Sequence, residues 1–143
     1  MLAAPPAPPP KFEGPTIVHP SVAPDFSLRD QNGRTVRLSA QRGKVVLITF
    51  LYTHCPDLCP LTAVHIDEAL GRLGARRSGV VALAITVDPK GDTPASMRRF
   101  VRSHAFRPQF RYLTGATRGK TRVIFDALAE PAAMTHDLGV LLG

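Results

Sequence analysis

Residues 45–60 read VVLITFLYTHCPDLCP, an apolar run that ends in a loop with two cysteines and two prolines. The run from Val45 to Tyr52 is short and rich in β-branched and aromatic residues, which predicts a buried strand. Cys55 and Cys59 then lie just beyond the carboxyl end of a central strand. Because ligands bind at that edge of open α/β sheets, this stretch indicates both the fold and the position of a site.

A helix is predicted directly after the loop, since apolar residues recur at helical spacing from Leu61 to Leu73 and Gly74 marks a stop. Cys59 lies at the start of this helix, where unpaired N–H groups and the helix dipole stabilise a thiolate. Cys55 and Cys59 are the only cysteines of the chain. They indicate thiol redox chemistry or a thiophilic metal site. A purely structural disulfide is the weaker alternative, because so small a loop removes little chain entropy.

The rest of the chain alternates between strand and helix patterns. Residues 25–28 and 35–38 alternate in polarity around Asn32-Gly33, which predicts a leading β-hairpin. After the first core strand and helix we expect a strand over 80–87, a helix announced by Asp92-Thr93-Pro94 with Met97, Phe100 and Val101 on its inner face, a strand over 110–113, a helix over 121–129 and a strand over 137–142. This alternation predicts βαβ units and a largely parallel sheet.

Length and charge limit the class of protein. A chain of 143 residues suggests one domain with a single core. The formal net charge of +7 comes largely from arginines in the second half of the chain. These arginines form no ladder with aromatic residues, which argues against nucleic-acid binding. We interpret them as a solvated basic surface. A docking face for an acidic partner is the more specific but less favoured alternative.

The N-terminal segment differs from the remainder. Residues 1–10 read MLAAPPAPPP, which is typical of an extended polyproline spacer or a disordered tail. We therefore predict a flexible segment over 1–21 and one domain over 22–143. The sequence contains neither an apolar run long enough to span a bilayer nor a visible signal peptide. We expect contact with a membrane only through an anchor that this sequence lacks.

A cysteine pair between the first core strand and the first core helix is the thioredoxin arrangement. We therefore predict an α/β fold with a thioredoxin-like mixed sheet and an extra N-terminal β-hairpin. Thioredoxins have two residues between their cysteines, whereas three residues separate Cys55 from Cys59. The wider spacing allows the two sulfurs to open around a metal ion.

The chain from about Val22 onward resembles the Sco family, also called SenC, of copper proteins that help to assemble the copper A centre of cytochrome c oxidase. The residues that carry the resemblance are Tyr52-Thr53-His54-Cys55-Pro56-Asp57-Leu58-Cys59-Pro60, Val87-Asp88-Pro89 followed by Asp92-Thr93-Pro94, Leu113-Thr114-Gly115, and His136.

The resemblance implies that Cys55, Cys59 and His136 bind copper. Two thiolates suit Cu(I), and an added imidazole allows the site to hold Cu(II) as well. The implied function is that of a metallochaperone rather than an enzyme. Its implied partners are the apo form of the copper-bearing subunit of cytochrome c oxidase, or another copper protein, and a thiol reductant. The implied location is the extracytoplasmic face of a membrane, periplasmic or equivalent.

The sequence departs from the family pattern at three places. Lys90-Gly91 replaces an acidic-basic pair, Thr135 replaces the aspartate that usually precedes the histidine, and the segment between Gly115 and His136 is shorter than usual. Family members also continue past the equivalent of Gly143 into a partner strand and a closing helix. We expect either that these C-terminal elements are missing or that another chain covers the last strand.

The other histidines are weaker ligand candidates. His54 follows the strand and is expected to point away from the inside of the loop. His65 lies about 240° around the helix from the second cysteine, so the two do not share a face. His104 ends a basic helix, where its charge complements the dipole, and His19 lies in the irregular N-terminal segment.

Two other functions stay open. In a thiol-disulfide oxidoreductase, the more accessible Cys55 would attack a disulfide and Cys59 would resolve the mixed disulfide. A peroxidase of the peroxiredoxin type is suggested by the segment over 23–28. It ranks last because such proteins carry Thr or Ser three residues before the reactive cysteine, and this chain has Tyr52 there.

Overall fold

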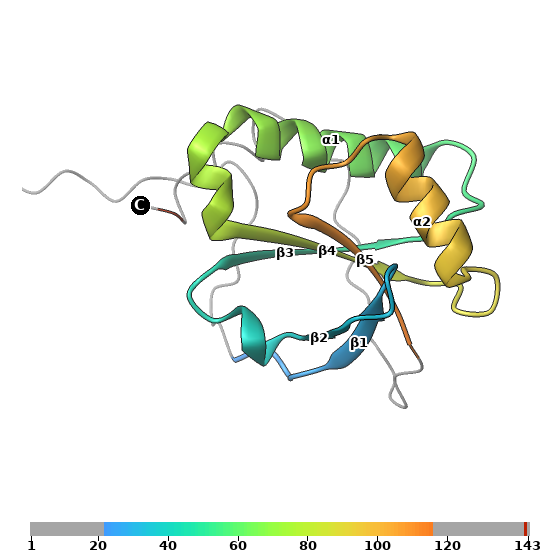
Figure 1. Cartoon of the computed structure of the whole chain (residues 1–143), viewed down its shortest axis with the longest axis horizontal. Coiled ribbons are helices and arrows are strands. Elements are labelled where there is room, and N and C mark those ends of the chain that lie inside the picture. Colours follow the sequence, from blue (N-terminus) through green and yellow to red (C-terminus); the bar gives the residue numbers. More distant parts are fainter. Residues whose placement is uncertain (1–21, 116–141, 143) are drawn as a thin grey trace, which may run out of the picture.

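The computed structural model describes residues 22–115 and Leu142, and these form a single mixed sheet with two helices (Figure 1). The elements in chain order are β1 (Ser27–Asp30), β2 (Thr35–Arg37), the 3₁₀ helix η1 (Ser39–Gln41), β3 (Val45–Leu51), α1 (Leu58–Arg72), the 3₁₀ helix η2 (Gly74–Gly79), β4 (Val80–Thr86), α2 (Pro94–Ser103) and β5 (Phe110–Thr114). The strand order is β2-β1-β5-β4-β3. Strands β3, β4 and β5 are parallel, and β1 is antiparallel to both β2 and β5.

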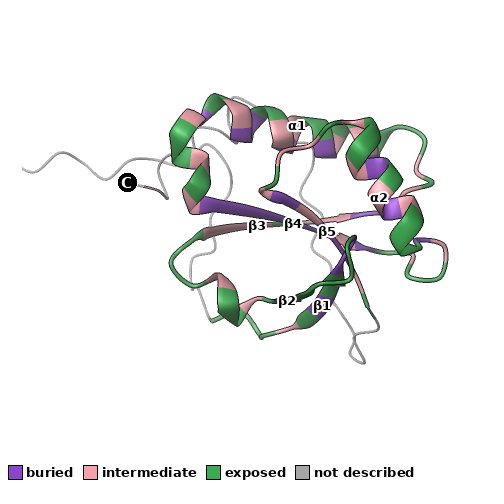
Figure 2. Cartoon of the chain, in the orientation of Figure 1, coloured by how far each residue is buried: buried purple, intermediate pink, exposed green. Residues whose placement is uncertain are grey.

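Both helices cover the same face of the parallel strands (Figure 1). Alternate residues of β4 point to opposite faces of the sheet. Val80, Ala82 and Ala84 therefore pack under the helices, whereas Val81 and Leu83 join a second apolar cluster with the hairpin. Strand β4 is almost continuously buried (Figure 2), which explains its uninterrupted apolar sequence.

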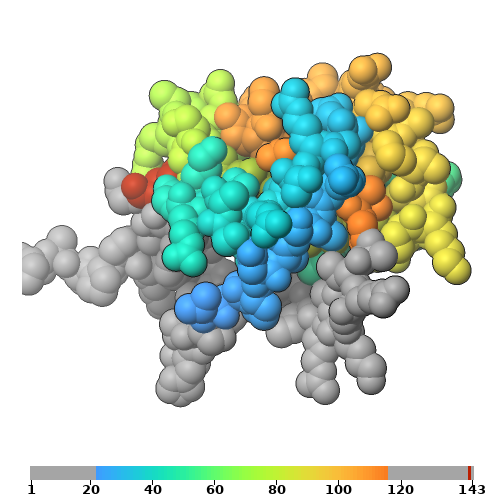
Figure 3. Space-filling view, turned by 60° about the horizontal axis from the view of Figure 1, so that its bottom comes forward, coloured from blue at the N-terminus to red at the C-terminus, as the bar shows by residue number. Residues whose placement is uncertain are grey.

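The predicted leading hairpin is confirmed, and β1 begins two residues later than expected. Leu28 pairs with Val36 across the hairpin, and both side chains are buried. Gly33 closes the turn with a φ of 78°, a conformation that glycine adopts at low cost. The Asp30 carboxylate accepts hydrogen bonds from the backbone N–H groups of Asn32 and Arg34. Figure 3 shows the hairpin in blue on the side of the molecule away from the helices.

Two predictions about the first core strand and helix are wrong in part. Among the described residues β3 pairs with β4 alone and stands last in the sheet, and only Leu51 of this strand is buried. Helix α1 begins three residues before Leu61. Of the predicted inner face, which was Leu61, Val64, Ala69, Leu70 and Leu73, the last three are buried, whereas Leu61 and Val64 are exposed. Cys59, Ala63 and Ile66 complete the buried face.

Several predicted features lie outside the described residues: the segment 1–21, the helix over 121–129, His136, and the last strand except Leu142. Leu142 is helical, so the predicted strand is wrong at this residue. It packs against the main apolar cluster, and Gly79 leaves the space, because a Cβ there would lie 2.7 Å from Leu142 Cδ2. In the described part of the chain, neither helix is long and apolar enough to cross a bilayer.

Candidate functional site

The cysteine loop begins where β3 and β4 end side by side. Val87 donates a backbone hydrogen bond to the carbonyl of Leu51 at 2.9 Å, which holds the two strand ends together. The chain then turns, with the N–H of Cys55 bonded to the carbonyl of Tyr52 at 3.3 Å. Helix α1 starts at Leu58, and this start places the second cysteine in its first turn.

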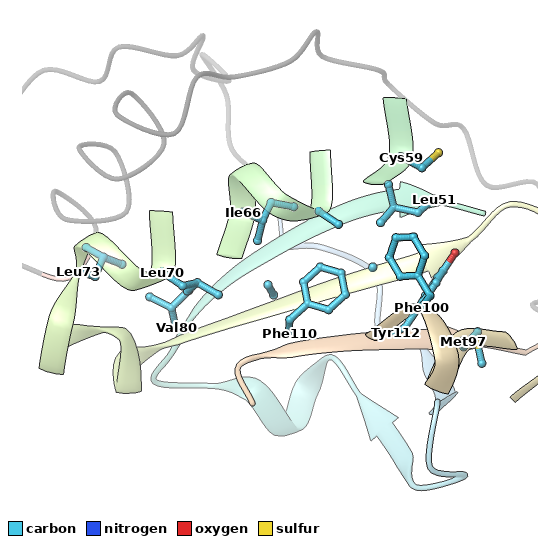
Figure 4. Packing of buried hydrophobic residues seen from close by; sticks show 13 residues of the cluster. Leu51, Cys59, Ile66, Leu70, Leu73, Val80, Met97, Phe100, Phe110 and Tyr112 are labelled. Atoms are coloured by element: carbon cyan, nitrogen blue, oxygen red, sulfur yellow. The ribbon is translucent and has the colours of Figure 1, made fainter. Parts of the chain in front are cut away.

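The two thiols are free and differ in exposure. Cys55 is partly exposed, whereas Cys59 is buried. Figure 4 shows Cys59 beside Leu51 at one end of the apolar core, with Leu73 at the other end. The N–H of Cys59 donates to the Cys55 sulfur at 3.4 Å. The structure therefore brings both predicted sulfur donors together, with one at the surface and one beneath it.

The surroundings separate the acidities of the two thiols. The hydrogen bond from the Cys59 thiol lowers the pKa of Cys55 to about 7, and the backbone N–H groups of Cys59 and Asp57 and the Tyr52 hydroxyl add to this shift. Burial raises the pKa of Cys59 to about 11, and the hydrogen bond to Cys55 adds to this increase. The expectation of a stabilised thiolate at Cys59 is therefore wrong. The N–H groups at the start of α1 point to the sulfur of Cys55 instead.

Alkylation of the reduced, metal-free protein with iodoacetamide is expected to modify Cys55 first. Only a thiolate reacts, so the rate should rise with pH through a midpoint near 7, the pKa of Cys55. Cys59 should stay unmodified at neutral pH, and mass spectrometry of proteolytic peptides would distinguish the two. Faster modification of Cys59 would contradict the assignment.

A buried carboxylate, Asp92, organises the backbone of the loop from below. It accepts hydrogen bonds from the Thr53 N–H at 2.9 Å, the Thr53 hydroxyl at 2.6 Å, the Thr86 hydroxyl at 2.7 Å and the Tyr112 hydroxyl at 3.0 Å. Burial opposes ionisation of Asp92, but the hydrogen bonds from Thr53, Thr86 and Tyr112 hold its pKa below the ordinary value. Asp92 therefore ties the residues before Cys55 to β4 and β5.

The sequence analysis named Asp92 only within the motif Asp92-Thr93-Pro94 and assigned it no role in the loop, because it stands in front of a helix start and resembles a capping residue. The N-cap is Thr93, whose hydroxyl accepts from the N–H of Ser96 at 3.1 Å. One feature of the sequence could have indicated this role. Thr93 directly precedes Pro94 and can itself be the N-cap of the helix, so Asp92 is not needed as a capping residue.

The described histidines do not join the cysteines. The His54 side chain is 67% exposed, and its Nδ1 lies 3.3 Å from the Thr53 hydroxyl and 3.9 Å from Asp92 Oδ1. His65 is half-buried on α1. His104 ends α2 as predicted, with Nδ1 2.8 Å from the carbonyl of Phe100. Residues 22–115 contain no group of three metal-binding side chains, and His136 lies outside the described residues.

The class of protein follows from these features. A parallel βαβ core whose first strand ends in a loop of two thiols, with the second thiol in the first turn of the following helix, defines a thioredoxin-like protein. The sequence model of one family, described as SCO1/SenC, matches residues 15–134. The chain belongs to the SCO1/SenC family.

Known proteins agree with this membership. The mitochondrial SCO2 homolog of Bos taurus is 44% identical over 95 residues, which cover 64% of this chain and 35% of that protein. The copper-bound structure of Bradyrhizobium japonicum ScoI is 42% identical, with a TM-score of 0.61 over 67% of this chain and 60% of that one. BsSco, described as a Sco-family cytochrome c oxidase assembly protein with a disulfide switch, is 27% identical, with a TM-score of 0.59 over 66% of this chain and 56% of that one.

These findings confirm the predicted family and the thioredoxin-like fold. Homologous Sco proteins have been solved with copper bound. The chain spans less than half the length of the curated relatives it matches.

Proposed function

We propose that this protein binds one copper ion as cargo through Cys55 and Cys59 and delivers it for assembly of the copper A centre of cytochrome c oxidase. The observation that carries the proposal is the pair of adjacent free thiols at the surface end of the core. Thiolates are the ligands that Cu(I) prefers. Copper-bound homologues and the description of BsSco as an oxidase assembly protein support it.

The chemistry of the donor set fits a copper ion that must later leave. Cys55 has a pKa near 7 and supplies a thiolate at neutral pH, whereas Cys59 keeps its proton until a metal displaces it. Loading therefore releases at least one proton. We propose His136 as the third ligand, with its imidazole nitrogen supporting Cu(II). Three protein ligands leave one side of the ion open for a recipient.

The proposed setting is the extracytoplasmic face of a membrane, periplasmic or equivalent. The bovine relative is named as a mitochondrial protein. Residues 1–21 would act as a spacer from a membrane anchor to the domain over 22–143. The proposed partners are the apo form of the copper-bearing oxidase subunit and a thiol reductant that keeps Cys55 and Cys59 reduced.

A thiol-disulfide oxidoreductase is the second candidate, and the unequal acidity of the two cysteines favours it. The Cys55 thiolate would attack a partner disulfide and release one partner thiolate, which takes up a proton. The Cys59 thiol would then lose its proton and attack the Cys55 sulfur, which forms the Cys55–Cys59 disulfide and releases the second partner thiol. An external dithiol reductant would restore the starting state. This chemistry and copper binding use the same reduced pair, so they compete.

A titration with Cu(I) and Cu(II), followed by absorption, tests the proposal. The reduced protein should bind one equivalent of copper. The protein oxidised to the Cys55–Cys59 disulfide should bind none, because the S–S bond consumes the thiolates, and a reductant should restore loading. Equal uptake by the oxidised protein would move the site away from the cysteines.

Replacement of His136 by alanine should affect the two copper states differently. Two thiolates already satisfy Cu(I), whereas Cu(II) gains from a nitrogen ligand, so the variant should lose or reshape the Cu(II) charge-transfer bands and keep most of its Cu(I) affinity. His54→Ala is the matched control, because this ring is exposed and its described contacts are to Thr53 and Asp92 and not to either sulfur. If His54→Ala removed the Cu(II) bands and His136→Ala left them unchanged, the third ligand would be local to the loop.

A further inference from the structure

Helix α2 presents a basic face beside the cysteine loop. Arg99 and Arg102 are exposed on this helix, and Arg98 is half-buried with its guanidinium bonded to the carbonyl of Gln31 at 3.0 Å. We call Arg98, Arg99 and Arg102 the α2 basic face. The sequence of α2, PASMRRFVRS, contains no acidic residue that could neutralise these charges.

Arg99 and Arg102 differ from three other arginines of the described chain, which form ion pairs within the fold. Arg72 pairs with Glu68, Arg107 with Asp67, and Arg111 with Asp30. Over residues 22–115, Arg99 and Arg102 form no such ion pair. The dipole of α2 favours a cation in its last turn, which accounts for Arg102 but not for Arg99, which lies in the middle of the helix.

Two hollows connect this face to the cysteine loop. The first, about 460 Å³, is lined by Ala95, Arg98, Arg99, Arg102 and Ser103. The second, about 300 Å³, is lined by Thr53, His54, Pro60, Ser96, Arg99, Phe100, Ser103 and His104. Arg99 and Ser103 border both. His54 and Pro60, which flank the two cysteines in the sequence, line the second hollow, so this hollow borders the cysteine loop.

We propose that the α2 basic face docks an acidic segment of a partner protein and holds that partner next to Cys55. The inference rests on the proposed function, since it identifies the surface through which a copper donor or recipient would approach. Guanidinium groups bind carboxylates in bidentate geometry, and unpaired exposed charge speeds the encounter with an oppositely charged partner.

A protein segment suits this surface better than a lipid bilayer. The charges occupy one short helix and border hollows that accept projecting side chains, whereas a bilayer presents a broad sheet of headgroups. A bilayer pressed against α2 would also cover the hollow that borders the cysteine loop, and a protein that exchanges copper must approach this loop.

The test uses the reaction of Cys55 with peptide disulfides in the reduced, metal-free protein. One probe is an eight-glutamate peptide whose terminal cysteine is linked to thionitrobenzoate; the other carries serines in place of the glutamates. The Cys55 thiolate attacks the peptide sulfur, forms the mixed disulfide and releases yellow thionitrobenzoate. The ratio of the two initial rates measures docking and cancels changes in the reactivity of Cys55 itself.

The wild-type protein should react about tenfold faster with the glutamate peptide at low ionic strength, and salt should remove the difference. The double variant Arg99→Glu/Arg102→Glu should lower the ratio to about one or less. Arg42→Glu/Lys44→Glu is the matched control, with the same charge change on exposed residues at the opposite end of β3. It should keep most of the preference.

An equal loss in both double variants would overturn the proposal, because it would reflect net charge alone. Sedimentation with vesicles of phosphatidylglycerol and phosphatidylcholine adds a second arm: if only Arg99→Glu/Arg102→Glu lost vesicle binding while the peptide preference stayed, the face would bind lipid. No copper is present in either arm. If the copper titration showed no binding, the proposed function would be overturned, but the ratio of the peptide rates would be unaffected. If the ratio showed no preference for the glutamate peptide, the docking proposal would be overturned, but the copper titration would be unaffected.

Discussion

Replacement of Cys55 or Cys59 by serine is expected to abolish copper binding. Each change removes one of only two thiolates in the chain, and a serine hydroxyl does not ionise to replace it as a soft ligand. The affinity for copper should fall by more than roughly 100-fold, which is the loss expected when a residue that only hydrogen-bonds to a metal ligand is removed. Copper content after competition with a Cu(I) chelator and desalting would measure the loss.

The two variants differ in what they risk for the fold. Cys59 is buried, so serine there places a hydroxyl in the apolar core at a cost of about 1–3 kcal/mol. Cys55 is partly exposed, and Cys55→Ser should fold with wild-type stability. Cys55→Ser is therefore the decisive variant, and stoichiometric copper in it would refute the paired-thiol site. His54→Ala, a change at the neighbouring exposed residue, should bind copper normally.

The sequence predicted those parts of the fold that local patterns determine. The alternation around Asn32-Gly33 predicted the β1–β2 hairpin, the apolar run from Val80 predicted β4, and Thr93-Pro94 predicted the start of α2. Each of these signals lies within a few neighbouring residues. The inner face of α1 was harder to predict. Leu61 and Val64 fit the helical repeat just as the buried residues of this helix do, yet both are exposed.

The electrostatics of the site could not be read from spacing. Which cysteine is acidic depends on where the first N–H groups of α1 point and on how deeply each sulfur is buried, and both are set by the packing of α1 on the sheet. The same holds for Asp92, whose partners Thr53, Thr86 and Tyr112 come from three separate parts of the chain. Such contacts exist only after the strands have assembled.

Loss of the Asp92 carboxylate is expected to destabilise the whole domain. Asp92→Ala would leave the hydroxyls of Thr86 and Tyr112 buried without their acceptor, and each unsatisfied group costs about 1–3 kcal/mol. A total loss near 3 kcal/mol is a large part of the roughly 5–15 kcal/mol that stabilises a typical domain. Thermal unfolding should show it as a decrease in Tm of about 10 °C.

Asp88→Ala is the matched control, because Asp88 lies in the same loop, is partly exposed and accepts from the Gly91 N–H at 3.0 Å. It should cost no more than about 1 kcal/mol. The pH dependence adds an independent check through Asp92→Asn. The pKa of Asp92 is lowered from 3.8, so its ionised form stabilises the fold above about pH 4, and this contribution disappears as the pH falls through the lower, folded pKa. The stability difference between the wild type and Asp92→Asn should therefore be full at pH 6 and shrink below about pH 4. A difference that is constant over this range, or an Asp88→Ala loss equal to that of Asp92→Ala, would show that Asp92 is not the ionised centre of this network.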